Sequence, residues 1–264
     1  RRQRQMCIRD RNTWFPYWKY LNNYRARVSS ILQNVDMQTD IAILPPNADL
    51  WTEMGVQTEP FPRDLNVTYT SLIWEAIHKN GGGADYLSES IIEKCDVRDG
   101  HLCYGPKSYS AIFLPDVKGT TQGVMDKLLE FVRGGGRVFC IGTYPQRSLG
   151  LKDYQERDAK MRATVDELKG YADRFVLLEK PQDGKYLEWY RAVMDKYQLS
   201  HAVTITNPDR FVLQNRYKAD DGSDLFFFAN VNLKDSKQTD VVFPESMTCG
   251  KSAWLYDPAD GKRY

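Results

Sequence analysis

The sequence predicts an α/β protein: a mostly parallel sheet covered by helices on both faces, followed by the start of an antiparallel β-sandwich. Two observations indicate this class. From residue 40 to about 200, short apolar runs alternate with longer amphipathic segments, as expected for strands joined by helical crossovers. After about residue 201 the helical periodicity stops, and short apolar runs are separated by turn residues.

The first element is an amphipathic helix expected over 12–34. Its apolar residues recur at three- and four-residue steps and form one broad face: Trp14, Tyr17, Trp18, Leu21, Tyr24, Val28, Ile31 and Leu32. Asn12 or Thr13 can cap the helix, and Pro16 is tolerated in its first turn. Such a face is expected to pack against a partner, and no earlier segment supplies one, which indicates a truncated chain. The alternative, a sugar-stacking platform at 14–18, is less common at helical spacing than core packing.

Residues 35–200 are expected to form the α/β domain. Its predicted strands are at 40–44, 84–87, 109–115, 137–142 and 175–178. Its predicted helices are at 68–80, 122–133, 154–171 and 186–197. Asp99-Gly100 predicts the tight turn of a small hairpin, and a Pro-rich loop is expected over 45–66. Strands that alternate with helices favour a flavodoxin-like or Rossmann-like arrangement.

Residues 201–264 are expected to begin the β-sandwich. Two apolar runs flank a turn at 219–223, which is typical of a hairpin. Further short strands are expected at 241–243 and 253–256, and a turn at 257–261. The chain stops where a strand should return, so we expect truncation at this end as well.

Residues 1–11 have a different composition from the rest. They contain five Arg and one Asp and show no apolar periodicity. The run resembles translated sequencing adapter, an artefact at the ends of metagenomic reading frames, and we expect it to be non-native. The alternative is a basic arm for nucleic acid or a membrane surface. Without its net charge of +4, the formal charge of the chain falls from +1 to −3, which offers no basic footprint for nucleic acid.

Composition also limits membrane and metal sites. The sequence has no run of eighteen apolar residues, so no membrane span is predicted. The cysteines show no CxxC spacing and the three His are scattered, so no zinc site is predicted. Cys95 and Cys103 face each other across the expected hairpin, either as a disulfide or as free thiols. No pair of catalytic carboxylates can be identified among 35 acidic residues, and no cofactor is predicted.

Two motifs suggest chemistry that their context does not support. The Gly triplets 81–83 and 134–136 each follow a predicted helix, where Gly is a C-cap, whereas a phosphate loop precedes a helix. Cys140 ends a predicted strand, where class I glutamine amidotransferases carry their nucleophile on a G-x-C-x-G elbow. Val138 occupies the place of the small residue, and His201-Ala202-Val203 does not match that family's His-x-Glu pair. We therefore expect an amidotransferase-like fold without its chemistry.

Several segments in colinear order resemble family 106 glycoside hydrolases, the α-L-rhamnosidases. The aromatic-Pro helix start at 12–18 and the Y-x-A-R match at 24–27 resemble the segment that leaves that family's catalytic barrel. Four further segments resemble other family motifs: 39–45, 98–115, 128–136 and 224–230. The stretch 254–262 resembles L-W-D-P-x-T-G-K, with Tyr256 in place of the usual Trp.

The resemblance implies that the catalytic residues belong to a different domain. The family's catalytic glutamates and calcium site belong to a (β/α)8 barrel that this sequence lacks, so no catalytic or metal-binding residue is assigned here. If the helix at 12–34 is the last of that barrel, its N-terminus lies on the catalytic face, and Asn12 and Trp14 become neighbours of the sugar cleft. The partners implied are the missing barrel of the same parent chain and, through it, a carbohydrate. A periplasmic or extracellular location is implied by the family.

The expected function is therefore that of a non-catalytic accessory region, which braces the barrel of a bacterial glycoside hydrolase acting on plant or microbial polysaccharides. Two alternatives stay open. The amidotransferase-like domain recurs in family 42 β-galactosidases, where it supports trimers, so the chain can be an oligomerisation or carbohydrate-binding module. The other alternative is an active thiol enzyme that uses Cys140.

Overall fold

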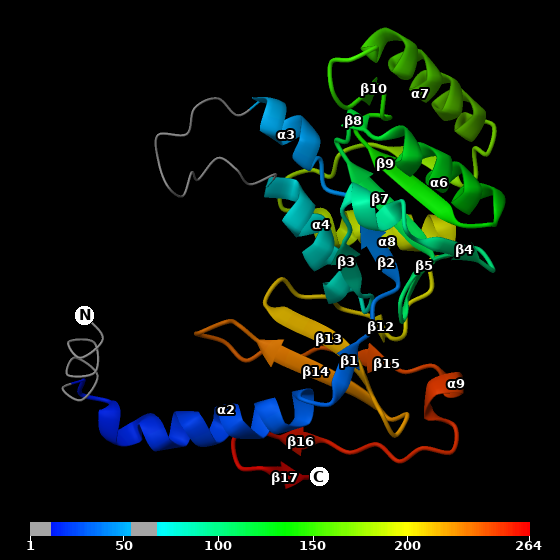
Figure 1. The fold of residues 1–264 in the computed structure, drawn as a ribbon. Helices are drawn as coiled ribbons and strands as arrows, with labels where there is room; N and C mark the ends of the chain where they lie inside the picture. The colour runs from blue at the N-terminus through cyan, green and yellow to red at the C-terminus, as the bar shows by residue number, and fades with distance from the viewer. Residues whose placement is uncertain (1–11, 54–67) are drawn as a thin grey trace. The chain divides into compact units, whose positions relative to one another are not determined.

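The computed structural model describes residues 12–53 and 68–264 (Figure 1). The expected non-native extension at 1–11 lies outside these residues. Contacts divide the chain into two compact units, whereas the boundaries expected at residues 34 and 200 stay predictions. No helix among the described residues has the length and apolar character needed to cross a bilayer.

The two units are built from separate stretches of the chain. We call one the terminal unit; it comprises the described residues up to Met37, with Tyr217–Leu225 and Pro244–Tyr264. The other, the central unit, comprises Gln38–Arg216 and Phe226–Phe243.

A five-stranded sheet forms the middle of the central unit. Its strands, in spatial order, are β11 (Phe175–Leu178), β9 (Arg137–Ile141), β7 (Ala111–Pro115), β2 (Ile41–Ile43) and β3 (Ala84–Tyr86). All neighbouring pairs are parallel. The chain first steps from β2 outward to β3, then returns to β7 on the other side of β2 and continues outward. The strand order therefore reverses between β2 and β7, the place where open α/β sheets bind ligands beyond their carboxyl ends.

Each face of the sheet is covered by helices because successive strand residues point to opposite sides. Ala42 and Leu44 belong to one buried cluster, with side chains of α5 (Glu89–Ile92), α6 (Gln122–Arg133) and α7 (Tyr154–Lys169). Ile41 and Ile43 belong to the other, with side chains of α4 (Thr68–Lys79) and α8 (Tyr186–Tyr197). Full burial of one such aliphatic side chain stabilises the fold by about 1.5–3 kcal/mol. The predicted α/β class with a parallel sheet is confirmed.

Both Gly triplets follow helices, as the sequence predicts. Gly81 comes two residues after α4 and Gly135 two residues after α6, with φ of 101° and 108°. A Cβ on Gly81 would lie 2.2 Å from the Val203 carbonyl oxygen. These glycines thus end helices and allow close backbone packing, the role expected of C-cap glycines.

A small antiparallel sheet is inserted between β3 and β7. It contains β4 (Asp96–Arg98), β5 (His101–Tyr104) and β6 (Lys107–Tyr109). The predicted turn joins β4 to β5, with positive φ at Asp99 and Gly100. Tyr109, predicted as the first residue of the next buried strand, instead ends β6. Cys95 and Cys103 are both free thiols.

Five further elements of the central unit are short. Strand β8 (Gly119–Thr120) pairs with β10 (Arg147–Ser148), and β12 (Thr204–Ile205) pairs with β15 (Val241–Val242). Helix α3 (Asn47–Glu53) occupies part of the segment predicted to be a loop. That prediction was wrong for α3 because Pro45 and Pro46 precede the helix and do not interrupt it. The remainder of the predicted loop, to residue 66, lies outside the described residues.

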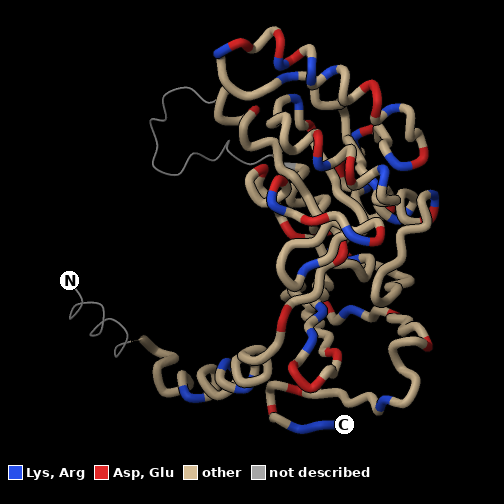
Figure 2. Tube along the Cα trace, turned by 45° about the vertical axis from the view of Figure 1, so that its right-hand side comes forward, with Lys and Arg blue, Asp and Glu red and all other residues tan. Residues whose placement is uncertain are grey.

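The terminal unit begins with the predicted aromatic helix. A short 3₁₀ segment, η1 (Phe15–Tyr17), leads into α2 (Trp18–Leu32), and β1 (Val35–Met37) follows. No side chain of α2 is buried, and its charged residues are all basic (Figure 2). The predicted core packing of its aromatic face is therefore absent within the described chain.

The expected sandwich is represented by short antiparallel pairs. Strand β1 pairs with β13 (Val212–Ala219), whose other neighbour is β14 (Asp224–Asn230). The terminal unit also contains α9 (Glu245–Thr248) and the hairpin of β16 (Tyr256–Asp257) and β17 (Lys262–Arg263). A complete β-sandwich stays a prediction.

Candidate functional site

An exposed aromatic surface covers the start of the terminal unit; we define it by Trp14, Phe15, Tyr17, Trp18, Tyr20 and Tyr24. Trp14 is 57% exposed, and its ring centroid lies 6.4 Å from that of Trp18. Asn12 orders the turn before it, because its Oδ1 accepts a hydrogen bond from the Trp14 N–H at 3.2 Å. The structure thus brings together the two residues that the sequence predicts beside a sugar cleft.

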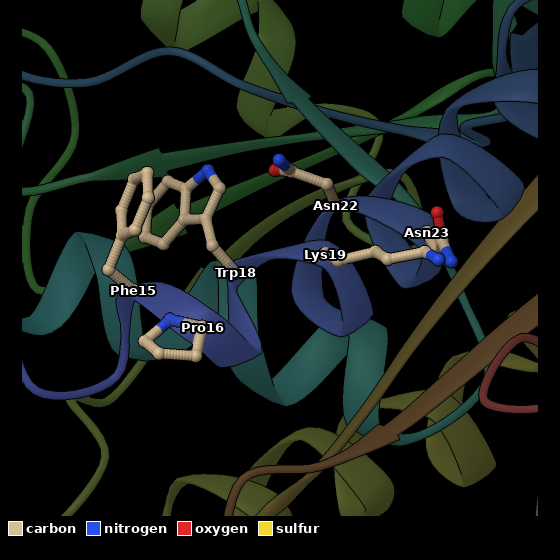
Figure 3. Close-up of a pocket in the computed structure, with 6 residues that line it drawn as sticks. All are labelled: Phe15, Pro16, Trp18, Lys19, Asn22 and Asn23. Atoms are coloured by element: carbon tan, nitrogen blue, oxygen red, sulfur yellow. The ribbon is translucent and has the colours of Figure 1, made fainter. Parts of the chain in front are cut away.

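A shallow depression lies on this aromatic surface. It has a volume of about 540 Å³ and is lined by Phe15, Pro16, Trp18, Lys19, Asn22 and Asn23. Figure 3 shows the rings of Phe15 and Trp18 directed to the same side of the helix, with the amide of Asn22 further along it. Exposed aromatic side chains of this size are candidates for burial against a partner, because removal of apolar surface from water is favourable.

Arg27, in the C-terminal half of α2, binds the turn at 257–261. Its Nη1 donates to the carbonyl oxygens of Pro258 at 3.1 Å and Ala259 at 2.7 Å. A Cβ on Gly261 would lie 3.1 Å from the Arg27 Nε. Two segments far apart in the sequence, 24–27 and 257–261, therefore meet in the terminal unit. The contact joins residues more than 230 positions apart, which no local sequence pattern indicates.

Cys140, the alternative nucleophile, is fully buried within β9. Its strand neighbours are Leu114 and Leu177. Burial alone raises the pKa of the Cys140 thiol far above its ordinary value. Since the thiolate is the reactive form, this environment opposes nucleophilic chemistry at neutral pH.

His201 belongs to a chain of polar side chains that the sequence did not reveal and that is buried except at Asp40, whose side chain is 31% exposed. Its Nδ1 lies 2.5 Å from Asp40 Oδ2, and its Nε2 lies 2.8 Å from the Tyr190 hydroxyl. The other carboxylate oxygen of Asp40 accepts from the Gly83 N–H at 2.9 Å. The side chain of His201 is only 1% exposed. A Cβ on Gly82 would lie 2.6 Å from the His201 ring, so glycine is needed there.

The position of this polar chain argues for a structural role. Asp40 immediately precedes β2, and Gly83 immediately precedes β3. The polar chain therefore lies at the amino ends of the parallel strands, opposite the end where such sheets bind ligands. Nearby, Asp85 accepts from Thr39 at 2.5 Å and from the Tyr109 hydroxyl at 2.9 Å. Burial, and then the Asp85 carboxylate, raise the pKa of Tyr109 well above its ordinary value.

Beyond the carboxyl ends of the strands, part of the crevice is occupied by an ion pair. Asp116 follows β7 with a positive φ of 51°, and its Oδ2 lies 2.6 Å from Lys180 Nζ. A Cβ on Gly142, just after β9, would lie 2.6 Å from both the Asp116 Oδ1 and the Lys180 Cε. Glycine at this position therefore allows the ion pair to close over the strand ends.

The same end of the sheet also has an open depression of about 490 Å³. It is lined by Ala48, Trp51 and Thr52 from α3, by Glu89, Ser90 and Glu93 around α5, and by Thr121, Leu149 and Gly150. These segments follow β2, β3, β7 and β9, so four connections converge there. Sequence reasoning missed Trp51 because it lay in the predicted loop; Pro45-Pro46-Asn47 before Ala48 was the available helix-start signal. Within the described ranges, no group of three or more His, Cys, Asp or Glu is placed to hold a metal ion.

Comparison with known proteins shows a shared fold and no close relative. No protein-family model matches the sequence, and no curated protein matches it. A β-galactosidase from Rahnella sp. R3 is similar in structure, with a TM-score of 0.50 and 14% identity, over 75% of this chain and 36% of that one. A catalytic mutant of a glycoside hydrolase family 42 β-galactosidase from G. stearothermophilus has a TM-score of 0.48 and 15% identity, over 86% of this chain and 38% of that one.

The chain thus spans little more than a third of the length of these structures. At 14% identity the likeness to the Rahnella sp. R3 enzyme shows the fold alone. The described chain therefore has an α/β fold found within a larger glycoside hydrolase chain.

Proposed function

We propose that this chain is a non-catalytic accessory region of a bacterial α-L-rhamnosidase-like glycoside hydrolase, and that the aromatic surface of η1 and α2 packs against the catalytic barrel. The observation that carries the proposal is the exposure of this helix, which has six aromatic rings on or next to it and no buried side chain. An aromatic side chain contributes 150–250 Å² of contact surface when buried. Each ring that became buried would stabilise an interface by about 1.5–3 kcal/mol.

The positive charge of α2 indicates what kind of surface would bind it. Lys19, Arg25 and Arg27 are its charged residues, and Arg27 already binds the last turn of the chain. A complementary barrel surface would therefore be apolar with acidic groups at its rim. In this arrangement Asn12 and Trp14 lie at the helix N-terminus, the end that faces the sugar cleft of a (β/α)8 barrel.

The central unit would act as a support. Its parallel strands have the spatial order 2-1-3-4-5 when numbered along the chain, which supports a flavodoxin-like or amidotransferase-like assignment. Its fully buried Cys140 and its polar chain at the amino ends of the strands support a role without bond chemistry. In the proposal, the catalytic carboxylates belong to the barrel, and the parent enzyme works in the periplasm or outside the cell on polysaccharides.

Two measurements test the proposal. The isolated chain should not hydrolyse aryl α-L-rhamnosides or aryl β-galactosides above the rate of a heat-denatured sample, and clear turnover would disprove a non-catalytic role. The gene upstream of the codon for residue 12 should encode an in-frame barrel with two positioned glutamates. An upstream frame without such a barrel would refute the accessory role.

A second candidate is an oligomerisation domain of a β-galactosidase-like hydrolase, which the structural similarity to the Rahnella sp. R3 enzyme favours. Light scattering separates the two candidates. If copies of this chain assemble through the aromatic surface, Trp18→Ala should lower the measured mass, whereas Trp254→Ala, also an exposed tryptophan of the terminal unit, should not. A monomer at all concentrations would favour the barrel-bracing role.

A further inference from the structure

We propose that the depression at the carboxyl ends of β2, β3, β7 and β9 binds a neutral pyranose sugar, with Trp51 stacking on the ring and Glu89 and Glu93 accepting hydrogen bonds from its hydroxyls. This inference goes beyond the accessory role because it gives the central unit a ligand of its own. We name the depression the Trp51 site. Its six polar or aromatic members are Trp51, Thr52, Glu89, Ser90, Glu93 and Thr121.

The location of the Trp51 site follows from the strand order. The chain reverses direction between β2 and β7, and connections from both sides of this reversal supply the lining. Helix α3 follows β2, and Glu89 begins the short helix after β3. Thr121 follows β7, and Leu149 follows β9. Open α/β sheets hold their ligands at this topological position because the diverging connections leave a crevice there.

The walls of the Trp51 site are held in place by hydrogen bonds. Asp49 Oδ2 accepts from the N–H groups of Lys118 at 2.8 Å and Gly119 at 3.2 Å, which ties α3 to β8. On the other side, Arg157 Nη2 donates to the Gly150 carbonyl oxygen at 2.8 Å. A binding surface built on such fixed elements loses little entropy when a ligand is bound.

Glu93 is positioned by the start of α6. The Thr121 hydroxyl donates to Glu93 Oε1 and also accepts from the Val124 N–H at 3.2 Å, which caps the helix. A Cβ on Gly123 would lie 2.7 Å from the same carboxylate oxygen, so glycine leaves room for it. The positive end of the α6 dipole stabilises this carboxylate. The carboxylate is therefore held in position as an acceptor for a sugar hydroxyl.

The combination of side chains fits a neutral sugar better than an ion. Trp51 is 73% exposed and offers a flat apolar face next to three hydroxyl-bearing residues, Thr52, Ser90 and Thr121. An indole has one apolar body and one polar edge, which matches the apolar C–H face and polar rim of a pyranose. The N-terminus of α6, which lies beside Glu93, offsets part of the negative charge of the two carboxylates.

Saturation-transfer NMR on the whole 264-residue chain tests the proposal. The probes are methyl α-L-rhamnopyranoside, methyl β-D-galactopyranoside and methyl α-D-mannopyranoside at millimolar concentration, with tetramethylammonium chloride as the cationic probe. We expect transfer to the axial C–H protons of at least one sugar and none to tetramethylammonium. Trp51→Ala should weaken the sugar's binding about tenfold or more, and Trp51→Phe should retain part of it.

The matched control is Trp254→Ala, since Trp254 is 70% exposed and lies in the terminal unit. It should bind as the unsubstituted chain does, and near-UV circular dichroism should show that all variants are folded. Transfer to tetramethylammonium in place of sugar, sugar binding unchanged in Trp51→Ala, or no binding of any probe would each overturn the proposal. None of these results bears on the upstream barrel or on turnover of aryl glycosides, so failure here and failure of the accessory role are distinguishable.

Discussion

At the scale of single residues, burial decides which of the reactive side chains can act. Cys140 looks like a nucleophile in the sequence because it lies near the end of an apolar strand, two residues before Gly142. In the structure it is enclosed by the sheet and by the helices of one face. Sequence alone could not establish this, because strand periodicity does not tell which face the thiol occupies or what covers it.

Alkylation with iodoacetamide should therefore distinguish the cysteines. Among the four described cysteines of the folded chain at pH 8, Cys249, which is exposed, should react first, and Cys140 should react only after unfolding. Cys95 should also be slow, because burial raises its pKa to about 11. Mass spectrometry of peptides gives the rates. Labelling of Cys140 as fast as Cys249 in the folded chain would favour the thiol-enzyme alternative.

The Asp40–His201–Tyr190 chain is a second feature decided at this scale. Asp40→Ala removes the acceptor for both His201 and the Gly83 N–H. Leaving buried polar groups unpaired costs about 1–3 kcal/mol, so the free energy of unfolding should fall by about that amount.

Urea denaturation measures the effect. Asp96→Ala is the matched control, because Asp96 makes an exposed ion pair with Arg98, and such pairs contribute little to stability. Equal destabilisation by the two substitutions would show that the buried chain of hydrogen bonds has no special role.

At the scale of elements, the clearest sequence patterns gave the best predictions. The strands around 41–43, 111–115, 137–141 and 175–178 were found because continuous apolar runs between helices are typical of buried parallel strands. Helix α3 was missed because two prolines and a short length hide its periodicity. The Trp51 site was missed with it, since three of its nine lining residues belong to that helix.

Arg27 provides a test of how the terminal unit is held together. Arg27→Ala should release the 257–261 turn and let the β16–β17 hairpin open more often, because two charge-assisted hydrogen bonds are lost. The Leu255 and Tyr264 amides, which bond to each other's carbonyl oxygens, should exchange about tenfold faster with solvent. Arg25→Ala, an exposed position on the same helix, is the control, and equal exchange in both variants would contradict the Arg27 contact.

At the scale of the whole molecule, His78 should make stability depend on pH. Burial lowers the pKa of His78 below its ordinary value, with partial opposition from hydrogen bonds to Gln214 and Ala84. The unfolded chain therefore binds a proton near pH 6.5 that the folded chain does not bind until lower pH. The stabilisation is present above pH 6.5 and is lost as pH falls through this window.

Urea denaturation midpoints measured between pH 7.5 and 5.5 check the prediction. In His78→Gln the midpoint should change less with pH. Carboxyl groups with lowered pKa do not affect stability in this pH range. The carboxyl groups with lowered pKa, such as Asp158 and Asp209, change stability only at lower pH, near and below about pH 4. An unchanged pH dependence of the midpoint in His78→Gln would refute the assignment.

The sequence by itself determined the α/β class, the parallel strands and the aromatic helix, because these depend on the local period of apolar residues. It also predicted that Asn12 and Trp14 lie close together, since they belong to one turn. Only the tertiary structure decided that His201 meets Asp40, that Arg27 meets the last turn and that Trp51 meets Glu93 across a depression. These pairings join residues far apart in the chain, so no local pattern specifies them. In the central unit they arise because the strand order sets which connections come together.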